Sequence, residues 1–315
     1  MPFCAKVEHA ATDTSDATAA GGHVELKTSE AWCGEAELKA AAEAADAVVV
    51  FTGTELGYQE NMESEGRDRV VFDLPPELQK AMHTILDWKL PRVVVVSRSG
   101  TPVGYTWTGK AAAILQTSYL GMEEGNSICD VLFGDVNPCG KLAQTWPRSY
   151  ADTAVAQCGT YNATNVTYNE RFYVGYRWHD AKGIAPLFPF GHGLSYTTFA
   201  YEVEKAERPL SVRVRVTNAG KVAGKEVVQL YAAYPGAKVE RCVKELKGFE
   251  KVALAPGETK TVEFGLSPRD LAYWDEFLHR FRADAGEYEL LVGSSSSDIR
   301  GRVAVSLAET ALFAD

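Results

Sequence analysis

The residues best suited to do chemistry lie in one acidic stretch, residues 54–69, directly after the short apolar segment 47–53. The stretch contains four glutamates and an Asp–Arg pair: Glu55, Glu60, Glu63, Glu65, Asp68 and Arg69. The apolar segment predicts a buried β-strand, and an open α/β sheet binds ligands outside the carboxyl ends of its strands. A carboxyl group in such a crevice is a candidate general acid, because partial burial raises its pKa towards neutral pH. A solvated acidic loop has the same composition, so these residues alone leave both interpretations open.

The elements that must position this stretch alternate between strands and helices. Residues 35–45 are rich in alanine, which favours a helix. Prolines in residues 74–77 mark the start of another helix, whose apolar residues Leu78, Met82, Ile85 and Leu86 recur at helical spacing. The expected strands cover 47–53, 92–97 and 111–117, and the expected helices cover 35–45, 77–88 and 123–133. Such alternation predicts parallel βαβ units.

The pattern changes after residues 189–196, where short alternating strands begin. In residues 210–216, the apolar side chains at even positions share one face and Arg213 and Arg215 share the other. The same alternation recurs in 225–233, 259–266, 287–292 and 302–307. This spacing predicts a β-sandwich of about 100 residues that begins near residues 196–200. We expect Phe249 and Trp274 in its core.

Length and charge narrow the classes of function. A chain of 315 residues suggests two domains. Its 32 basic and 42 acidic residues give a net charge of −10, which disfavours nucleic acid or an anionic membrane as partner and is compatible with neutral substrates. Basic residues in 238–251 alternate with glutamates, so we expect a mixed solvated surface there. We see no apolar run of membrane-spanning length and no signal peptide.

Other chemistries lack their motifs. The six cysteines have neither metal-site nor disulfide-scaffold spacing, and the histidines have no partner at metal spacing. No Gly-x-Gly-x-x-Gly fingerprint and no Gly-x-Ser-x-Gly elbow occurs, and His192 between two glycines favours a turn role over catalysis. We therefore expect no cofactor and no metal. The sequons at Asn162 and Asn165 matter only in a eukaryotic secretory route, so the compartment stays open.

Several motifs resemble the carboxyl-terminal part of glycoside hydrolase family 3, the β-glucosidase and β-xylosidase family. They occur in the family's order from about residue 35 to residue 307. The motifs are Glu-Ser-Glu-Gly-Arg-Asp-Arg at 63–69, Asp-Val-Leu-Phe-Gly-Asp-Val-Asn-Pro at 130–138, Phe-Pro-Phe-Gly-His-Gly-Leu-Ser-Tyr at 188–196, Gly-Lys-Glu-Val-Val-Gln-Leu-Tyr at 224–231 and Lys-Glu-Leu-Lys-Gly-Phe-Glu at 244–250.

The resemblance implies an α/β fold with two domains. A poorly defined lead-in, 1–30, is expected before a mostly parallel α/β sandwich domain, 31–196, which is incomplete at its N-terminus. A fibronectin type III-like all-β sandwich, 197–315, is expected to follow. Members of the family are retaining exo-glycosidases, in which an aspartate on a separate (β/α)8 barrel is the nucleophile and a glutamate on the α/β domain is the acid/base. Retention requires the two carboxyl groups about 5–5.5 Å apart.

The family motif, carried over position by position, assigns the acid/base to Glu65, with Glu63 and Glu55 as alternatives. Asp68 and Arg69 are expected to support the loop through a charge-assisted pair. Tyr58, the aromatic residue nearest to these carboxyls in the sequence, is a candidate for stacking on sugar.

The sequence also departs from the family, because the barrel and its nucleophile have no counterpart. Asp87 precedes a tryptophan, as the family nucleophile does, but it ends a predicted helix and is interpreted as structural. The resemblance therefore implies the C-terminal part of a β-glycosidase acting on terminal β-linked glucosides or xylosides, nearly inactive alone, with the barrel supplied in trans or lost. The alternative is a non-catalytic module for carbohydrate binding or subunit association. Both predict an exposed apolar surface.

Overall fold

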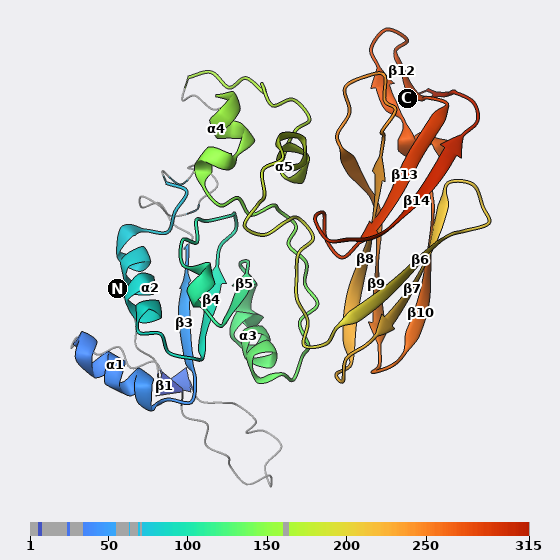
Figure 1. Cartoon of the computed structure of the whole chain (residues 1–315). Coiled ribbons are helices and arrows are strands. Elements are labelled where there is room, and N and C mark those ends of the chain that lie inside the picture. Colours follow the sequence, from blue (N-terminus) through green and yellow to red (C-terminus); the bar gives the residue numbers. More distant parts are fainter. Residues whose placement is uncertain are drawn as a thin grey trace. The chain divides into compact units, whose positions relative to one another are not determined.

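The computed structural model describes residues 6–7, 24–25, 34–54, 63, 69, 71–159 and 164–314 (Figure 1). By contacts between Cα atoms the chain separates into two compact units, Met1–Arg98 with Tyr105–Thr117, and Ser99–Gly104 with Ser118–Asp315. Each unit is described by itself. In the first, the two-residue strands β1 (Lys6–Val7) and β2 (Val24–Glu25) pair antiparallel.

A parallel three-stranded sheet organises the first unit. Its strands are β3 (Val48–Gly53), β4 (Val93–Arg98) and β5 (Ala113–Thr117), in the order β3-β4-β5. The accompanying helices are α1 (Glu35–Ala44), α2 (Pro76–Asp87) and the 3-10 turn η1 (Thr108–Lys110). The bounds of the three strands, α1 and α2 agree with the predicted elements within two residues, whereas η1 had no predicted counterpart. The parallel pairing confirms the predicted βαβ organisation.

Helix α2 follows from its local sequence. Pro75 caps it and Pro76 occupies its first turn, where a missing N–H costs nothing. Its apolar side chains at helical spacing include Met82 and Leu86, which are buried. Burial of this face, rather than helix propensity alone, provides most of the stability of a helix of this length.

The strands differ in how far they are buried. Strand β4 lies in the middle of the sheet and buries Val93, Val95 and Val96, as its continuous apolar run predicts. The prediction of a buried strand is wrong for β3, where Val49 is 42% exposed and Phe51 is 63% exposed. Strand β3 is at the edge of the described sheet, and alternate side chains point to a face that is not covered.

The second unit contains short helical segments, most of which precede its strands; η4 lies between β10 and β11. The helical segments are η2 (Gly121–Glu123), α3 (Glu124–Phe133), η3 (Tyr150–Asp152), α4 (Ala154–Cys158), α5 (Tyr176–Lys182) and η4 (Pro268–Leu271). One sheet has the order β10-β7-β6, with β6 (Phe199–Lys205), β7 (Ser211–Asn218) and β10 (Thr259–Gly265). The other has the order β14-β13-β8-β9, with β8 (Gly224–Ala233), β9 (Lys244–Leu254), β13 (Gly286–Gly293) and β14 (Ile299–Leu307). All pairs in these two sheets are antiparallel.

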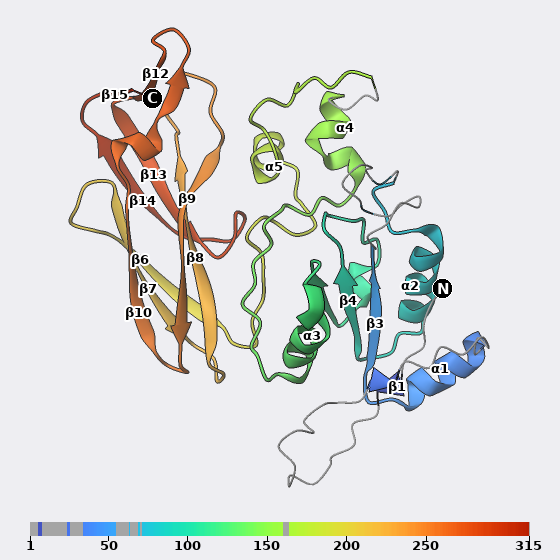
Figure 2. The same cartoon turned by 180° about the vertical axis from the view of Figure 1, so that it is seen from behind.

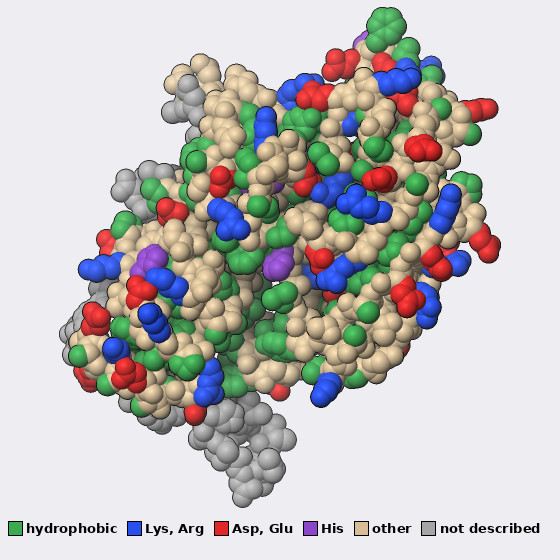
Figure 3. All heavy atoms as spheres, in the orientation of Figure 1, with side chains coloured by type: hydrophobic (Ala, Val, Ile, Leu, Met, Phe, Trp, Pro, Cys, Tyr) green, Lys and Arg blue, Asp and Glu red, His purple; other side chains and the backbone are tan. Residues whose placement is uncertain are grey.

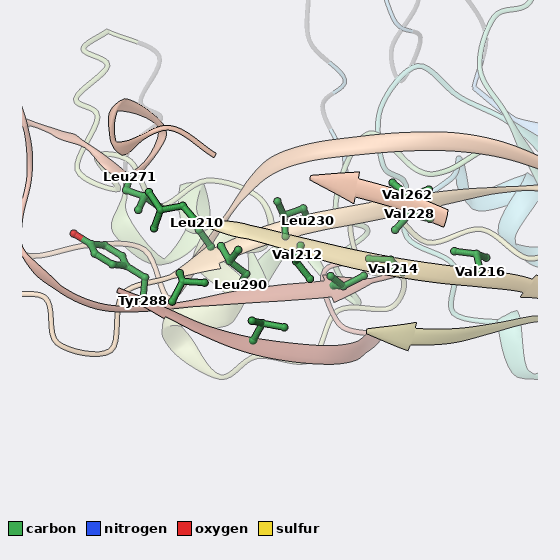
Figure 4. Packing of buried hydrophobic residues seen from close by; sticks show 14 of the residues in the cluster. Leu210, Val212, Val214, Val216, Val228, Leu230, Val262, Leu271, Tyr288 and Leu290 are labelled. Carbon is green, nitrogen blue, oxygen red and sulfur yellow. The ribbon is translucent and has the colours of Figure 1, made fainter. Parts of the chain in front are cut away.

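The core of the sandwich lies between these two sheets. Leu210 and the even-numbered valines of β7 are buried, which confirms the alternation read from the sequence. Figure 4 shows Val212, Val214 and Val216 along β7 among apolar side chains of other strands, such as Leu230 and Leu290. The odd positions carry Arg213 and Arg215, whose guanidinium groups pair with glutamates of the neighbouring strands. Alternating burial therefore sets the register of this sheet.

Two aromatic residues predicted in the core lie outside it. Phe249 is 69% exposed, because Val252 and Leu254 of β9 face the core and an odd spacing directs Phe249 to the opposite face. Trp274 is 39% exposed and packs edge-on against Phe281 at 5.1 Å. It belongs to a third sheet, of β11 (Tyr273–Asp275), β12 (Arg280–Ala283) and β15 (Ala311–Phe313), at one end of the sandwich (Figure 2).

Within the second unit, residues 118–196 contact the sandwich through buried polar groups. Lys141 and Glu226 form an ion pair at 2.8 Å, with side chains only 12% and 8% exposed. The Gln229 amide donates to the carbonyl of Gly191 at 3.1 Å. Gly191 has φ +81°, and a Cβ atom there would lie 2.2 Å from Gln229 Oε1, so this position requires glycine.

The predicted mixed surface at 238–251 is partly wrong. Lys238 and Lys251 are exposed, and the face of the sandwich drawn in Figure 3 carries basic and acidic side chains side by side. The side chains of Arg241 and Lys244, however, are each only 9% exposed. Arg241 lies over the Tyr234 ring at 3.6 Å, and Lys244 pairs with Asp180 at 2.5 Å. Both cations are compensated in their buried positions, Lys244 by Asp180 and Arg241 by Glu245, whose carboxylate lies 3.5 Å from its guanidinium.

Candidate functional site

The candidate site begins where β3 ends, at Gly53 and Thr54. Gly53 pairs with Arg98 at the end of β4, and the Thr54 amide donates to the Arg98 carbonyl at 2.7 Å. Gly53 has φ +140°, and a Cβ atom there would lie 1.9 Å from the Arg98 carbonyl oxygen. Only glycine permits this close approach of the two backbones. The glycine therefore fixes the point from which the acidic stretch leaves the sheet.

A row of polar side chains, the polar row, lies across the carboxyl ends of the three parallel strands. The register places Thr52, Ser97 and Gln116 side by side on β3, β4 and β5. The hydroxyls of Ser97 and Tyr105 are 2.5 Å apart, and Tyr105 donates to Gln116 Oε1 at 2.5 Å. Gln116 in turn donates to the Thr117 carbonyl at 2.7 Å. This chain of hydrogen bonds holds the strand ends at fixed positions.

Within the acidic stretch the structure describes Glu63 and Arg69. Arg69 Nε lies 3.3 Å from Glu63 Oε1, and the two side chains are 9% and 13% exposed respectively. Arg69 Nη1 also donates to the Phe72 carbonyl at 3.2 Å. These contacts join Arg69 to the Glu63 carboxylate and to the Phe72 backbone, and the role of Arg69 in supporting the loop stays a prediction. A guanidinium at this distance stabilises the ionised form of a carboxylate.

The other predicted site residues, Glu65, Glu55, Asp68 and Tyr58, lie outside the described residues. The assignment of the acid/base to Glu65 stays a prediction. In the sequence, Glu65 lies between the two residues that form the ion pair.

Two groups weighed in the sequence analysis, Asp87 and His192, make contacts within the fold. Asp87 pairs with Lys110 at 2.5 Å, and the hydrogen bond from Lys110 lowers the pKa of this exposed carboxyl group. His192 stacks on Phe188, with ring centroids 5.5 Å apart, and burial lowers its pKa, with a further contribution from Lys141. Among the described residues no group of His, Cys, Asp and Glu side chains could hold a metal ion. None of the described helices is long and apolar enough to cross a bilayer.

The comparison with protein families decides the affiliation. The family model described as "Glycosyl hydrolase family 3 C-terminal domain" matches residues 8–196. The chain belongs to glycoside hydrolase family 3. A second model, "Fibronectin type III-like domain", matches residues 226–296 of this family 3 chain. Family membership and the fold class, a parallel α/β part followed by a fibronectin type III-like sandwich, are thus confirmed.

Curated relatives of this family 3 chain carry the name β-glucosidase. It is 43% identical over 271 residues to "Probable beta-glucosidase H" of Emericella nidulans, covering 83% of this chain and 32% of that protein. It is 43% identical over 284 residues to "Beta-glucosidase" of Rhizobium radiobacter, covering 87% of this chain and 34% of that protein. The chain therefore spans about a third of the length of these curated relatives.

Solved structures that match this chain are also named β-glucosidases. β-Glucosidase from Kluyveromyces marxianus in complex with glucose matches with a TM-score of 0.81 at 38% identity, over 89% of this chain and 34% of that one. β-Glucosidase 3B from Thermotoga neapolitana in complex with glucose matches with a TM-score of 0.80 at 34% identity, over 90% of this chain and 41% of that one.

Sequence reasoning missed two features of this edge. Gly53 was treated as the end of a strand, although a glycine directly after an apolar run is a signal of close backbone approach. Nothing in the sequence marked Tyr105, which is buried and takes part in the polar row through its hydroxyl group.

Proposed function

We propose that this chain is the C-terminal part of a retaining β-glycosidase that hydrolyses terminal β-linked sugars, and that Glu65 is its general acid/base. The observation that carries the proposal is family 3 membership together with about 40% identity to relatives named β-glucosidases. Two similar solved structures are described as complexes with glucose, which supports a β-linked glucoside or oligosaccharide as the substrate.

The ion pair between Glu63 and Arg69 favours Glu65 over Glu63. A proton donor must be protonated at working pH, whereas an arginine 3.3 Å from a carboxylate stabilises its charged form. Glu63 is then better suited to support the loop. Glu55 remains the other alternative.

The proposed mechanism has two steps. A nucleophilic aspartate attacks the anomeric carbon while Glu65 gives its proton to the oxygen of the departing group. Glu65, now ionised, takes a proton from a water molecule that attacks the covalent intermediate, releasing the sugar and restoring both carboxyl groups. We propose that the aspartate comes from a barrel domain elsewhere in the same protein or on a separate chain. Residues 31–196 and 197–315 alone are then nearly inactive.

A second candidate function is a non-catalytic module for carbohydrate binding or subunit association. The apolar face of β3, where Val49 and Phe51 are exposed, fits this function and the first one alike, since both need a partner surface. An apolar face of a parallel sheet is ordinarily covered. A module of this kind needs a partner surface and no proton donor.

Trans-complementation separates the two functions. The chain is mixed with an isolated family 3 barrel, and hydrolysis of a chromogenic β-glucoside and β-xyloside is measured. We expect activity that falls at least about 100-fold in Glu65→Gln, because general acid–base catalysis contributes that much. In Glu65→Ala, azide should restore turnover of a substrate with a good leaving group by forming a glycosyl azide.

Glu60→Gln is the matched control, since it removes a neighbouring carboxylate that the family motif does not use. Equal activity in Glu65→Gln and Glu60→Gln contradicts the assignment of Glu65. A folded chain that gains no activity with any barrel tested supports the non-catalytic function instead.

A further inference from the structure

A thiol and an amine that are far apart in the sequence lie in contact within the second unit. The Lys251 amine donates to the Cys139 sulfur at 3.4 Å, across a separation of 112 positions in the chain. Cys139 directly follows the family motif at 130–138, and Lys251 lies on β9. A sulfur atom that has been oxidised to sulfenic acid condenses with a neighbouring nitrogen. The proposed mechanism of hydrolysis uses neither residue.

The backbone on both sides of Cys139 is held against the sandwich. Two positions before it, Asn137 Nδ2 donates to the Ala223 carbonyl at 2.9 Å. Two positions after it, Lys141 forms the buried ion pair with Glu226 at 2.8 Å. Cys139 has a free thiol and is partly exposed, so a small oxidant does not have to enter the core to reach it. The two anchors keep this thiol beside β9 in the folded protein.

Lys251 is available to form a bond with the thiol. It is exposed on β9 and, like Phe249, faces away from the core of the sandwich. Among the residues that the structure describes it forms no ion pair, whereas Lys141, Lys244 and Lys247 each pair with a carboxylate. A lysine amine is carried on a flexible four-carbon stem. The Lys251 amine can therefore move towards the sulfur without breaking a salt bridge.

We propose that Cys139 and Lys251 are a site of oxidative cross-linking, at which hydrogen peroxide converts the pair into a sulfenamide. Peroxide first oxidises the thiol to sulfenic acid and is itself reduced to water. The neutral amine then attacks the sulfur with its lone pair. The S–N bond forms as the S–O bond breaks, and the hydroxyl group leaves as a second water molecule with a proton from the amine. A thiol reductant restores both side chains and becomes a disulfide.

The cross-link fastens the segment before the sandwich to strand β9. It closes a loop of 112 positions, and a covalent bond across a long loop removes more of the freedom of the unfolded chain than one across a short loop. The oxidised protein should therefore unfold at a higher urea concentration than the reduced protein. The cross-link does not depend on Glu65, since neither of its residues belongs to the acidic stretch.

The test treats the 315-residue chain with hydrogen peroxide at mildly alkaline pH, where more of the lysine amines are neutral, and then alkylates the remaining thiols. The chain is digested with a protease that does not cleave at lysine, and the peptides are weighed by mass spectrometry. We expect the peptides of Cys139 and Lys251 to be joined and two hydrogen atoms lighter than their sum, and a thiol reductant to separate them.

Three variants locate the bond. The joined peptides and the rise in urea midpoint should be absent from Cys139→Ser and from Lys251→Arg. Lys251→Arg keeps the positive charge at an exposed position, so it should fold even if Cys139→Ser does not. Cys129→Ser is the matched control and should keep the cross-link, because this exposed cysteine contacts no lysine among the described residues.

Three results overturn the proposal. In the first, Cys139 of the folded chain is recovered after peroxide only as a thiol, as sulfinic or sulfonic acid, or in a disulfide. In the second, Lys251→Arg forms as much cross-linked peptide as the unchanged chain. In the third, the same cross-link forms equally in protein unfolded by guanidinium, so that the folded contact is not its cause. The mass is measured without a barrel or a substrate, so the hydrolysis assay does not affect this result.

Discussion

Replacing Gly53 by alanine tests how the candidate site is built. The backbone at Gly53 has φ +140°, a conformation that alanine adopts only with strain of about 1–3 kcal/mol. The new Cβ would also lie 1.9 Å from the Arg98 carbonyl oxygen, so β3 and β4 must separate at their carboxyl ends. Overpacking adds about 1–3 kcal/mol. The expected loss is therefore about 2–6 kcal/mol, against a total stability of about 5–15 kcal/mol for a domain.

Urea unfolding gives the overall loss, and amide hydrogen exchange locates it. The Thr54 amide, which donates to Arg98 at 2.7 Å, should exchange faster in Gly53→Ala, because this bond lies where the strands separate. Gly109→Ala is the matched control in the same unit. Its added Cβ would have no neighbour within 4 Å, and its φ is not in the positive range.

The reasoning is refuted if Gly53→Ala and Gly109→Ala unfold at the same urea concentration with the same exchange at Thr54. That result would mean that the two strand ends can separate without loss. The close approach of β3 and β4 would then not fix the start of the acidic stretch.

Two further predictions concern the second unit. Gly191→Ala should lower the free energy of unfolding, measured in urea, by about 2–4 kcal/mol, because of strain at φ +81° and loss of the hydrogen bond from Gln229. The control Gly236→Ala, whose added Cβ meets no atom within 4 Å, should change it little. Equal stability of the two variants would contradict the packing argument. For Glu245, burial raises the pKa, but Lys247 and other cationic neighbours outweigh it and hold the pKa below its ordinary value of 4.5. The Glu245 carboxylate therefore stabilises the fold above pH 4.5, and this contribution is lost as the pH falls through the lowered pKa. Glu245→Gln should weaken the decrease of stability in acid, measured by urea unfolding at several pH values. An unchanged pH dependence in the variant would refute this prediction.

The sequence predicts elements well where the decisive property is local. In β7, one face meets the core and the other meets solvent, so alternation of valine and arginine is enough to find the strand and its buried face. The prolines at 75 and 76 locate the start of α2 for a similar reason, since a missing N–H is tolerated only in the first turn.

The sequence predicts the burial of a single apolar residue less well. This burial depends on where the strand lies in its sheet and on which face of the strand the side chain occupies. Phe51 and Val95 occur in similar apolar runs, but β3 is at the edge of the described sheet and β4 is at its centre. Phe249 is aromatic and exposed because its parity relative to Val252 directs it away from the core. Composition contains neither the order of strands in a sheet nor the face that each side chain occupies.

The candidate site shows the same limit in its ion pair. The sequence suggested Asp68 and Arg69 as the supporting residues of the loop, because they are adjacent and opposite in charge. Asp68 lies outside the described residues, so its pairing with Arg69 stays a prediction. Among the described residues, Arg69 lies 3.3 Å from Glu63, six positions away in the chain. Spacing along a loop does not determine distance in space, so the family motif supplies the residue types while only the fold decides which of them meet.

Two family motifs that are far apart in the sequence pack against each other in the fold. The Phe-Gly-His-Gly segment needs glycine at 191 because Gln229, from the Val-Val-Gln-Leu-Tyr segment, occupies the space of a side chain. Gln229 also donates to the carbonyl of Ser294, the residue directly after β13, at 2.7 Å. A change of periodicity near residue 196 marks where the strands of the sandwich begin, but the buried pair Lys141–Glu226 crosses that point. Since removing one partner of a buried ion pair leaves an uncompensated charge, the sandwich supports the segment that precedes it as well as its own core.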